Sequence, residues 1–153
     1  MKDLHSDITV TTIVMAALAA DNTPAALDLK GYNAAEILLG VGIGGITFDA
    51  TNKIEFRLTH ADDKADGSAP DPGDYTAVDI DDVLGVSSVG TGGIIKALTA
   101  AHAAAAAYRV GYKGGKRWLK LLADFSGTHG AGTPLGLFLI KGHGADNPQA
   151  NQI

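Results

Sequence analysis

The feature that most constrains the fold is a strict alternation of apolar and polar side chains over residues 53–60. Ile54, Phe56 and Leu58 fall on one side of an extended chain, and charged or hydroxyl side chains occupy the positions between them. A helix would not separate the residues in this way, because its side chains repeat with a period of about 3.6 residues rather than two. The pattern therefore predicts a β-strand with one face in the core.

Similar short extended stretches recur along the chain, separated by segments rich in Gly, Pro, Asn and Asp. Strands are expected at residues 8–14, 26–29, 35–41, 53–60, 75–78, 94–98, 108–112, 117–125 and 135–141. The run 35–41 is almost continuously apolar, which predicts a strand that is buried on both faces. Regularly spaced short strands without long intervening helices are typical of an all-β sandwich. The predicted fold is a single-domain, antiparallel β-sandwich, jelly-roll-like, with about eight short strands.

The chain of 153 residues has the size of one domain. We expect the sandwich at residues 8–145, a flexible N-terminal arm at 1–7 and a polar C-terminal tail at 146–153. The apolar stretch 8–20 is too short to span a bilayer. The preceding residues carry two aspartates and lack the basic segment of a signal peptide, so the mature protein is expected to start at or near Met1.

Composition narrows the classes of partner. Charged residues make up only 19% of the chain, which suggests that part of the surface meets other protein rather than water. The formal net charge of -5 argues against a nucleic-acid-binding surface, because such surfaces neutralise phosphates with Lys and Arg. There is no cysteine, so disulfides and thiolate metal sites are excluded and the redox compartment stays open.

Residues 40–45 read Gly-Val-Gly-Ile-Gly-Gly and fit the G-x-G-x-x-G spelling of a dinucleotide-binding loop. That motif works because a helix follows the loop and points its N-terminal amides at the pyrophosphate. Here residues 46–53 are too few for the crossover, which takes about a dozen residues or more, before the strand at 53–60 begins. The glycines are therefore predicted to lie in a bend between antiparallel strands, with nothing bound there.

Two further segments carry local signals. Residues 99–107 are mostly alanine, which favours helix, but they have no polar face, so at most a short helical turn is expected there. Residues 113–116 read Lys-Gly-Gly-Lys between two extended stretches, which predicts a tight β-hairpin.

The histidines do not form a recognisable metal motif. They are His5, His60, His102, His129 and His143. None falls in an H-E-x-x-H or H-x-H arrangement, so they are interpreted as exposed or partly buried hydrogen-bonding side chains.

Asp124, Ser126 and His129 contain the residue types of a catalytic triad. They are too close in sequence to converge in the usual way, and no G-x-S-x-G elbow precedes the serine. We interpret them as turn residues. No catalytic residue, cofactor-binding residue or metal ligand is assigned in this chain, and no cofactor is expected.

The segment 62–74 is rich in aspartate and could suit calcium, which prefers oxygen ligands. Its spacing does not match an EF-hand loop, so a solvated acidic loop is favoured and calcium binding stays open. Trp118 and the tyrosines could form a sugar-binding platform. On a strand, however, an aromatic residue is more often part of the core.

The C-terminal part of the chain resembles a family of small structural proteins from the head gene clusters of tailed phages and prophages. The resemblance lies in the V-G-Y-K-G-G-K-R-W segment at 110–118, the aliphatic strand after it, the G-T-P turn and the closing K-G-H at 141–143. Residues 28–32 and 54–63 also look like the family, although Thr-His-Ala at 59–61 replaces its usual acidic residue and serine. The resemblance covers most of the chain from about residue 24.

This resemblance implies a non-enzymatic virion protein, most plainly a decoration or cement protein on the capsid exterior that is made in the cytoplasm of the bacterial host. Its partners would be the major capsid protein and further copies of itself, by analogy a trimer, without nucleic acid or membrane. Two alternatives remain: a tail or head-spike component, and a carbohydrate-binding module.

Overall fold

The structure is a computed structural model of the chain and describes residues 3–44, 46–101, 104–146 and 148–149. These residues form strands joined by loops and three short 3-10 helices, η1 (His5–Asp7), η2 (Pro72–Asp74) and η3 (Ile80–Asp82). The strands are β1 (Ile8–Leu18), β2 (Leu27–Asp28), β3 (Tyr32–Val41), β4 (Lys53–Ala61), β5 (Thr76–Ala77), β6 (Val83–Leu84), β7 (Ile94–Leu98), β8 (Ala106–Tyr112), β9 (Trp118–Ser126) and β10 (Thr133–Gly144). The predicted all-β class is confirmed.

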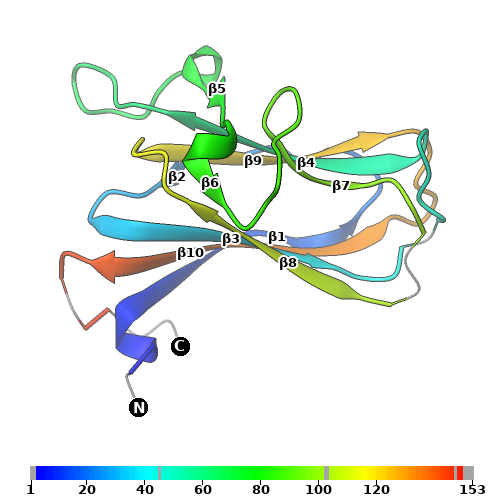
Figure 1. Cartoon of the computed structure of the whole chain (residues 1–153), viewed down its shortest axis with the longest axis horizontal. Helices are drawn as coiled ribbons and strands as arrows, with labels where there is room; N and C mark the ends of the chain where they lie inside the picture. The colour runs from blue at the N-terminus through cyan, green and yellow to red at the C-terminus, as the bar shows by residue number, and fades with distance from the viewer. Residues whose placement is uncertain (1–2, 45, 102–103, 147, 150–153) are drawn as a thin grey trace.

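The strands form two antiparallel sheets packed as a sandwich (Figure 1). Sheet A has the order β1-β10-β3-β8-β6, and sheet B has the order β2-β9-β4-β5, with β7 also paired to β4. The register places β5 at one end of β4 and β7 at the other, so the two short strands together take one position in sheet B.

The pairing is nested, which explains the strand order. β1 pairs with β10, β2 with β9 and β3 with β8, while β4 pairs with β5 and β7. Such a folded-over hairpin, whose strands alternate between two sheets, is the jelly-roll arrangement. The predicted jelly-roll-like sandwich is therefore confirmed, with β6 as an addition at the edge of sheet A.

The core lies between the sheets and consists of the inward-facing residues of the long strands. In β4 these are Ile54, Phe56 and Leu58, all fully buried, as the alternation of the sequence predicts. The neighbouring strand β9 and the facing strands β3 and β10 contribute equally apolar side chains. They are Ile37, Leu39 and Val41 from β3, Leu119, Leu121 and Ala123 from β9, and Leu135, Leu137 and Leu139 from β10.

Strand positions agree with expectation more closely than strand lengths do. β1 continues to Leu18 and β10 to Gly144, because the two strands pair with each other along nearly their whole length. In the segment 99–107 the described residues contain no helical turn, and Ala106 already begins β8. His102, which belongs to this segment, lies outside the described residues.

The predicted hairpin at residues 113–116 is wrong. β8 belongs to sheet A and β9 to sheet B, so the connection between them crosses the sandwich instead of joining two paired strands. Gly115 does adopt a positive φ of 73°, which is the property that the sequence signal reports. The signal specifies a turn, whereas the partner of each strand is decided by burial of its inward face.

The glycine motif is likewise part of a crossing rather than a bend between paired strands. Gly40 lies within β3, and the connection 42–52 leads from β3 in sheet A to β4 in sheet B. Its described residues contain no helix, and Gly45 lies outside them. The expectation of a bend between two antiparallel neighbours is therefore corrected, because β3 pairs with β10 and β8.

The described residues of the expected arm and tail, 3–7 and 146 with 148–149, lie near one another at one end of the molecule (Figure 1). The backbone N–H of Gln149 donates to the carbonyl oxygen of Ser6 at 2.9 Å. The hydroxyl of Tyr32 donates to Oε1 of Gln149 at 2.8 Å. None of the helices in the described ranges is long and apolar enough to cross a membrane.

Candidate interaction surface

The two outer faces of the sandwich differ in chemistry. On sheet B the outward positions of β4 and β9 carry charges that pair with one another: Glu55 lies 3.2 Å from Arg57, and Arg57 lies 2.7 Å from Asp124. Lys120, also outward, stacks over the ring of Tyr75 at 4.0 Å. This is the ordinary pattern of an antiparallel sheet with one solvated face.

The outer face of sheet A follows a different pattern. Between Pro134 and Gly142, the outward positions of β10 hold only Pro, Gly, Phe and Ile. The register sets three rows of outward residues across the sheet. They are Val10–Ile140–Glu36–Gly111–Leu84, then Thr12–Phe138–Leu38–Arg109, then Met15–Gly136–Gly40–Ala107. We call these three rows the A face.

Two charged residues lie in the three rows, and they neutralise each other. Nε of Arg109 lies 3.5 Å from Oε1 of Glu36. Because Glu36 is on β3 and Arg109 is on β8, the half of the A face formed by β1 and β10 is uncharged.

Large apolar side chains are exposed on the A face. Met15 is 73% exposed, Leu84 54% and Val10 38%, and Leu4, 67% exposed, lines a hollow beside Ile140 at the end of the same face. An isolated apolar residue on a surface is ordinary, whereas several on one sheet face mark a surface that another molecule covers.

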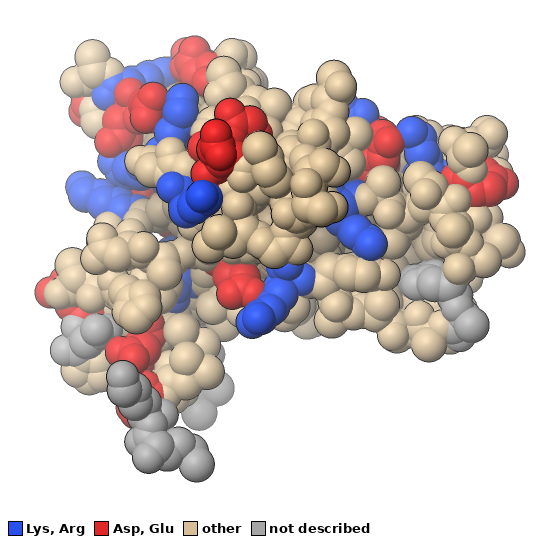
Figure 2. Space-filling model, viewed as in Figure 1, with Lys and Arg blue, Asp and Glu red and all other residues tan. Residues whose placement is uncertain are grey.

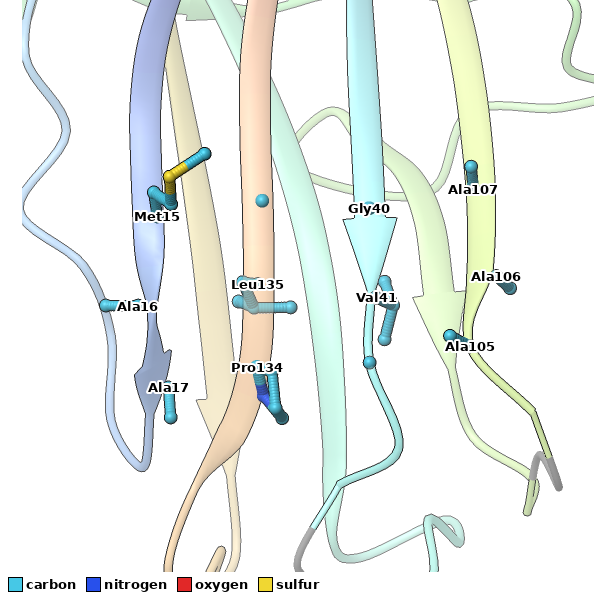
Figure 3. A pocket seen from close by; sticks show the side chains of 12 residues that line it. Met15, Ala16, Ala17, Gly40, Val41, Ala105, Ala106, Ala107, Pro134 and Leu135 are labelled. Atoms are coloured by element: carbon cyan, nitrogen blue, oxygen red, sulfur yellow. The ribbon is translucent and has the colours of Figure 1, made fainter.

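The third row contains an open groove (Figure 3). Its volume is about 690 Å³, and its walls come from four neighbouring strands, with Met15 on one side and Ala107 on the other. Gly40 and Gly136 lie between them and carry no side chain to fill the space. All twelve lining residues are apolar: Met15, Ala16, Ala17, Gly40, Val41, Gly42, Ala105, Ala106, Ala107, Pro134, Leu135 and Gly136.

The prediction that the run 35–41 is buried on both faces is wrong for the single chain. Ile37, Leu39 and Val41 point into the core and are buried, but Leu38 and Gly40 on the other side are only half-buried. Nothing in the described chain packs over the outer side of β3, so the second apolar face that the sequence encodes stays open to solvent.

The acidic loop 62–74 is held by internal contacts. Arg117 donates two hydrogen bonds to Asp28, at 2.7 and 2.8 Å, and a third to Asp63 at 2.9 Å. Nε1 of Trp118 also donates to Asp63, at 2.6 Å. The hydrogen bonds to Asp28 raise the pKa of Arg117 further above its usual range. In Figure 2 side chains of both signs lie close together at the corner that carries this loop.

The rest of this loop is stabilised in the same way. Lys64 pairs with Asp71 at 2.6 Å, and the carboxylate of Asp74 accepts from the backbone N–H of Asp71. Among the described residues, no three His, Asp or Glu side chains are close enough to hold a metal ion. The aspartates of the loop therefore act chiefly as turn and ion-pair residues.

The residue types of the triad do not come together. Asp124 pairs with Arg57, and Nε2 of His129 is 2.8 Å from the backbone carbonyl oxygen of Ser126 rather than from its hydroxyl. The His129 ring is buried against Phe125. Trp118 is only 9% exposed, which removes it as a sugar-binding platform. Of the other histidines, His5 lies in η1 and His143 on β10 is exposed.

His60 belongs to a buried polar cluster that sequence reasoning missed. Its Nδ1 lies 2.9 Å from the hydroxyl of Tyr112, which also accepts the backbone N–H of Lys116 at 3.1 Å. Nε2 of the same ring lies 3.8 Å from Oδ2 of Asp82. Burial lowers the pKa of His60 and raises that of Tyr112 to about 12.

This cluster joins the two sheets, since His60 is on β4 and Tyr112 on β8. Both side chains are at least nine-tenths buried. The cluster is closed by the crossing connection, because Lys113 donates its backbone N–H to the carbonyl oxygen of Asp82. We interpret it as a structural tie, because its polar atoms are used in holding the crossing against β4.

The comparisons with known proteins add no relative: family models, curated proteins and solved structures each gave no match to this chain. The geometry of the A face is therefore the main structural observation that bears on function.

Proposed function

We propose that this chain is a non-enzymatic structural protein of a tailed-phage virion, a decoration or cement protein that binds the lattice of the major capsid protein on the capsid exterior. It would be made in the cytoplasm of the bacterial host. The observation that supports the proposal is the A face, because it is suited to contact with protein, including the further copies of the chain that the proposal expects.

The resemblance of residues 110–143 to head proteins of tailed phages supplies the biological setting. The fold is compatible with it, because jelly rolls are common in viral capsid proteins, although they also occur in lectins and enzymes. Fold alone therefore adds little, and the proposal depends on the resemblance together with the A face.

The polar groups that could have suggested an enzyme support the proposal indirectly. Arg117, Asp63 and His60 are each engaged in contacts that hold loops or sheets together. A protein that acts by binding many copies of a lattice needs a rigid scaffold of this kind. Weak contacts then suffice, since several linked copies bind far more tightly than one.

The experiment is a binding assay with expanded capsids that lack decoration. The purified protein should bind saturably, at a fixed ratio to the major capsid protein. Capsids already saturated with the protein are the matched control and should take up no more. Failure to bind undecorated capsids, or binding to purified tails instead, would overturn the assignment to the capsid.

A further inference from the structure

We propose that the A face is the contact surface between two copies of this chain, which pair face to face through β1, β10 and β3. The inference concerns the purified protein alone and does not depend on the proposed role in the virion. It identifies which molecule covers the apolar surface described above.

The first argument is the shape of the third row. Met15, Gly136, Gly40 and Ala107 lie side by side on four neighbouring strands, so one large exposed side chain stands next to two positions without side chains. Figure 3 shows Met15 and Gly40 on the two strands that flank β10. The row thus carries both a projection and a hollow with room for it.

Such a row is complementary to itself. Consider a two-fold axis that lies between the A faces of the two copies and runs parallel to their strands. It reverses the order of the strands in the facing copy. If the axis passes near β10, Met15 of each copy comes over Gly40 of the other. A two-fold contact requires this kind of self-complementarity, since the same patch serves both subunits.

The second argument is charge. The whole chain has a formal net charge of -5, so two copies repel each other over most of their surfaces. On the A face the charges of Glu36 on β3 and Arg109 on β8 cancel, because the two side chains pair with each other. Two A faces can therefore approach without bringing unpaired charges into the centre of the contact.

The third argument is area. Three strands spaced roughly 4.8 Å apart and about ten residues long, at roughly 3.3 Å per residue, cover on the order of 500 Å². Two such faces bury about 1,000 Å², the lower limit for a specific interface. The expected dimer is thus weak and reversible.

The geometry favours a pair over the trimer expected by analogy. When a sheet face packs on the same face of a second copy, that one partner covers it. A third copy would need a different, heterologous surface.

The test is sedimentation equilibrium of the full chain across concentrations from about 1 μM to about 1 mM. Wild-type protein should shift from monomer to dimer. Met15→Lys should raise the dissociation constant at least tenfold, because it places an ammonium group in an apolar hollow. Ile80→Lys is the matched control: Ile80 is also exposed but lies on η3, and this variant should dimerise like wild type.

Met15→Lys should retain the wild-type melting temperature, because its side chain is mostly exposed in the single chain. A chemical probe makes the test independent of that variant. The chain has no cysteine, so Met15→Cys can be labelled with a maleimide at a single site. Labelling should slow as protein concentration rises, whereas labelling of Ile80→Cys should not.

Three results would overturn the proposal. They are a monomer at all concentrations, a trimer, or a dimer whose affinity Met15→Lys leaves unchanged. Loss of capsid binding with an intact dimer would count against the proposed function only.

Discussion

Gly40 and Gly136 face each other across β3 and β10, and a Cβ atom on Gly40 would lie 3.1 Å from the carbonyl oxygen of Gly136. Neither glycine has a positive φ, so the small residue is needed for close approach and not for backbone conformation. The outer side of Gly40 therefore contributes to the hollow of the A face, whereas the ring of Phe138 lies over Gly136.

Gly40→Ala should lower the free energy of unfolding by about 1–2 kcal/mol, because the methyl group meets a backbone oxygen that β1 and β3 hold in place from both sides. Urea unfolding measures the change. Gly73→Ala is the control, since no atom lies within 4 Å of its added Cβ. Equal effects of the two substitutions would contradict the close-approach interpretation.

Tyr112→Phe should cost about 1–3 kcal/mol of stability. The ring still fills its place, but the backbone N–H of Lys116 and Nδ1 of His60 both lose their partner in a buried site. Chemical unfolding followed by tryptophan fluorescence is a suitable measurement, because Trp118 follows the crossing connection. Tyr108→Phe, on the same strand, is the comparison and should be nearly neutral.

His60 should make the protein less stable in mild acid. Burial lowers the pKa of His60 in the folded state, so its contribution to stability is complete above the unfolded pKa of about 6.5 and is lost as the pH falls below it. One proton accounts for a slope of at most about 1.4 kcal/mol per pH unit. The groups that face the ring are Asp82, Lys116, Asp62 and Asp79.

The check is the urea midpoint of wild type and His60→Gln between pH 7 and pH 5. Glutamine can keep a hydrogen bond to Tyr112 but does not titrate. The variant should therefore lose less stability over this interval than wild type does. Parallel curves would show that another group causes the acid sensitivity.

Asp28 should matter at neutral pH but not in strong acid. Its hydrogen bonds from Arg117 lower the pKa of its carboxyl group, so its contribution is present above the unfolded pKa of about 3.9 and is lost as the pH falls through the lower folded value. Because the pair is partly exposed, Asp28→Asn should cost less than about 1 kcal/mol at pH 7. Thermal unfolding of both proteins should converge as the pH falls through the folded pKa of Asp28; a gap that persists below it would point to a purely geometric role.

Much of the fold could be predicted because it is encoded locally. The alternation over 53–60 specifies both the strand and its buried side. The strand expected at 94–98 has the same bounds as β7. The two glycine-rich connections could not be placed in the same way. A turn signal such as Gly114-Gly115 reports backbone conformation, whereas the choice between pairing and crossing depends on strands far away in the sequence.

The A face was open to prediction only in part. The apolar character of residues 35–41 on both faces was visible, and so was that of 135–141. The row that sets Met15 beside two glycines was not visible, because it exists only once the register of β1, β10 and β3 is known. The His60–Tyr112 contact was hidden for the same reason, since its two residues lie on strands of opposite sheets.

The position of β10 has a consequence for how the molecule is made. β10 lies between β1 and β3 and supplies the hydrogen-bonding partner of both, yet it follows them at a great distance along the chain. A ribosome releases β1 and β3 long before β10, so sheet A cannot close during most of synthesis and its ladders form late and slowly. The nascent chain must therefore avoid aggregation until β10 has been synthesised. Pairing of β10 with β1 and β3 is then the step that commits the protein to its native state.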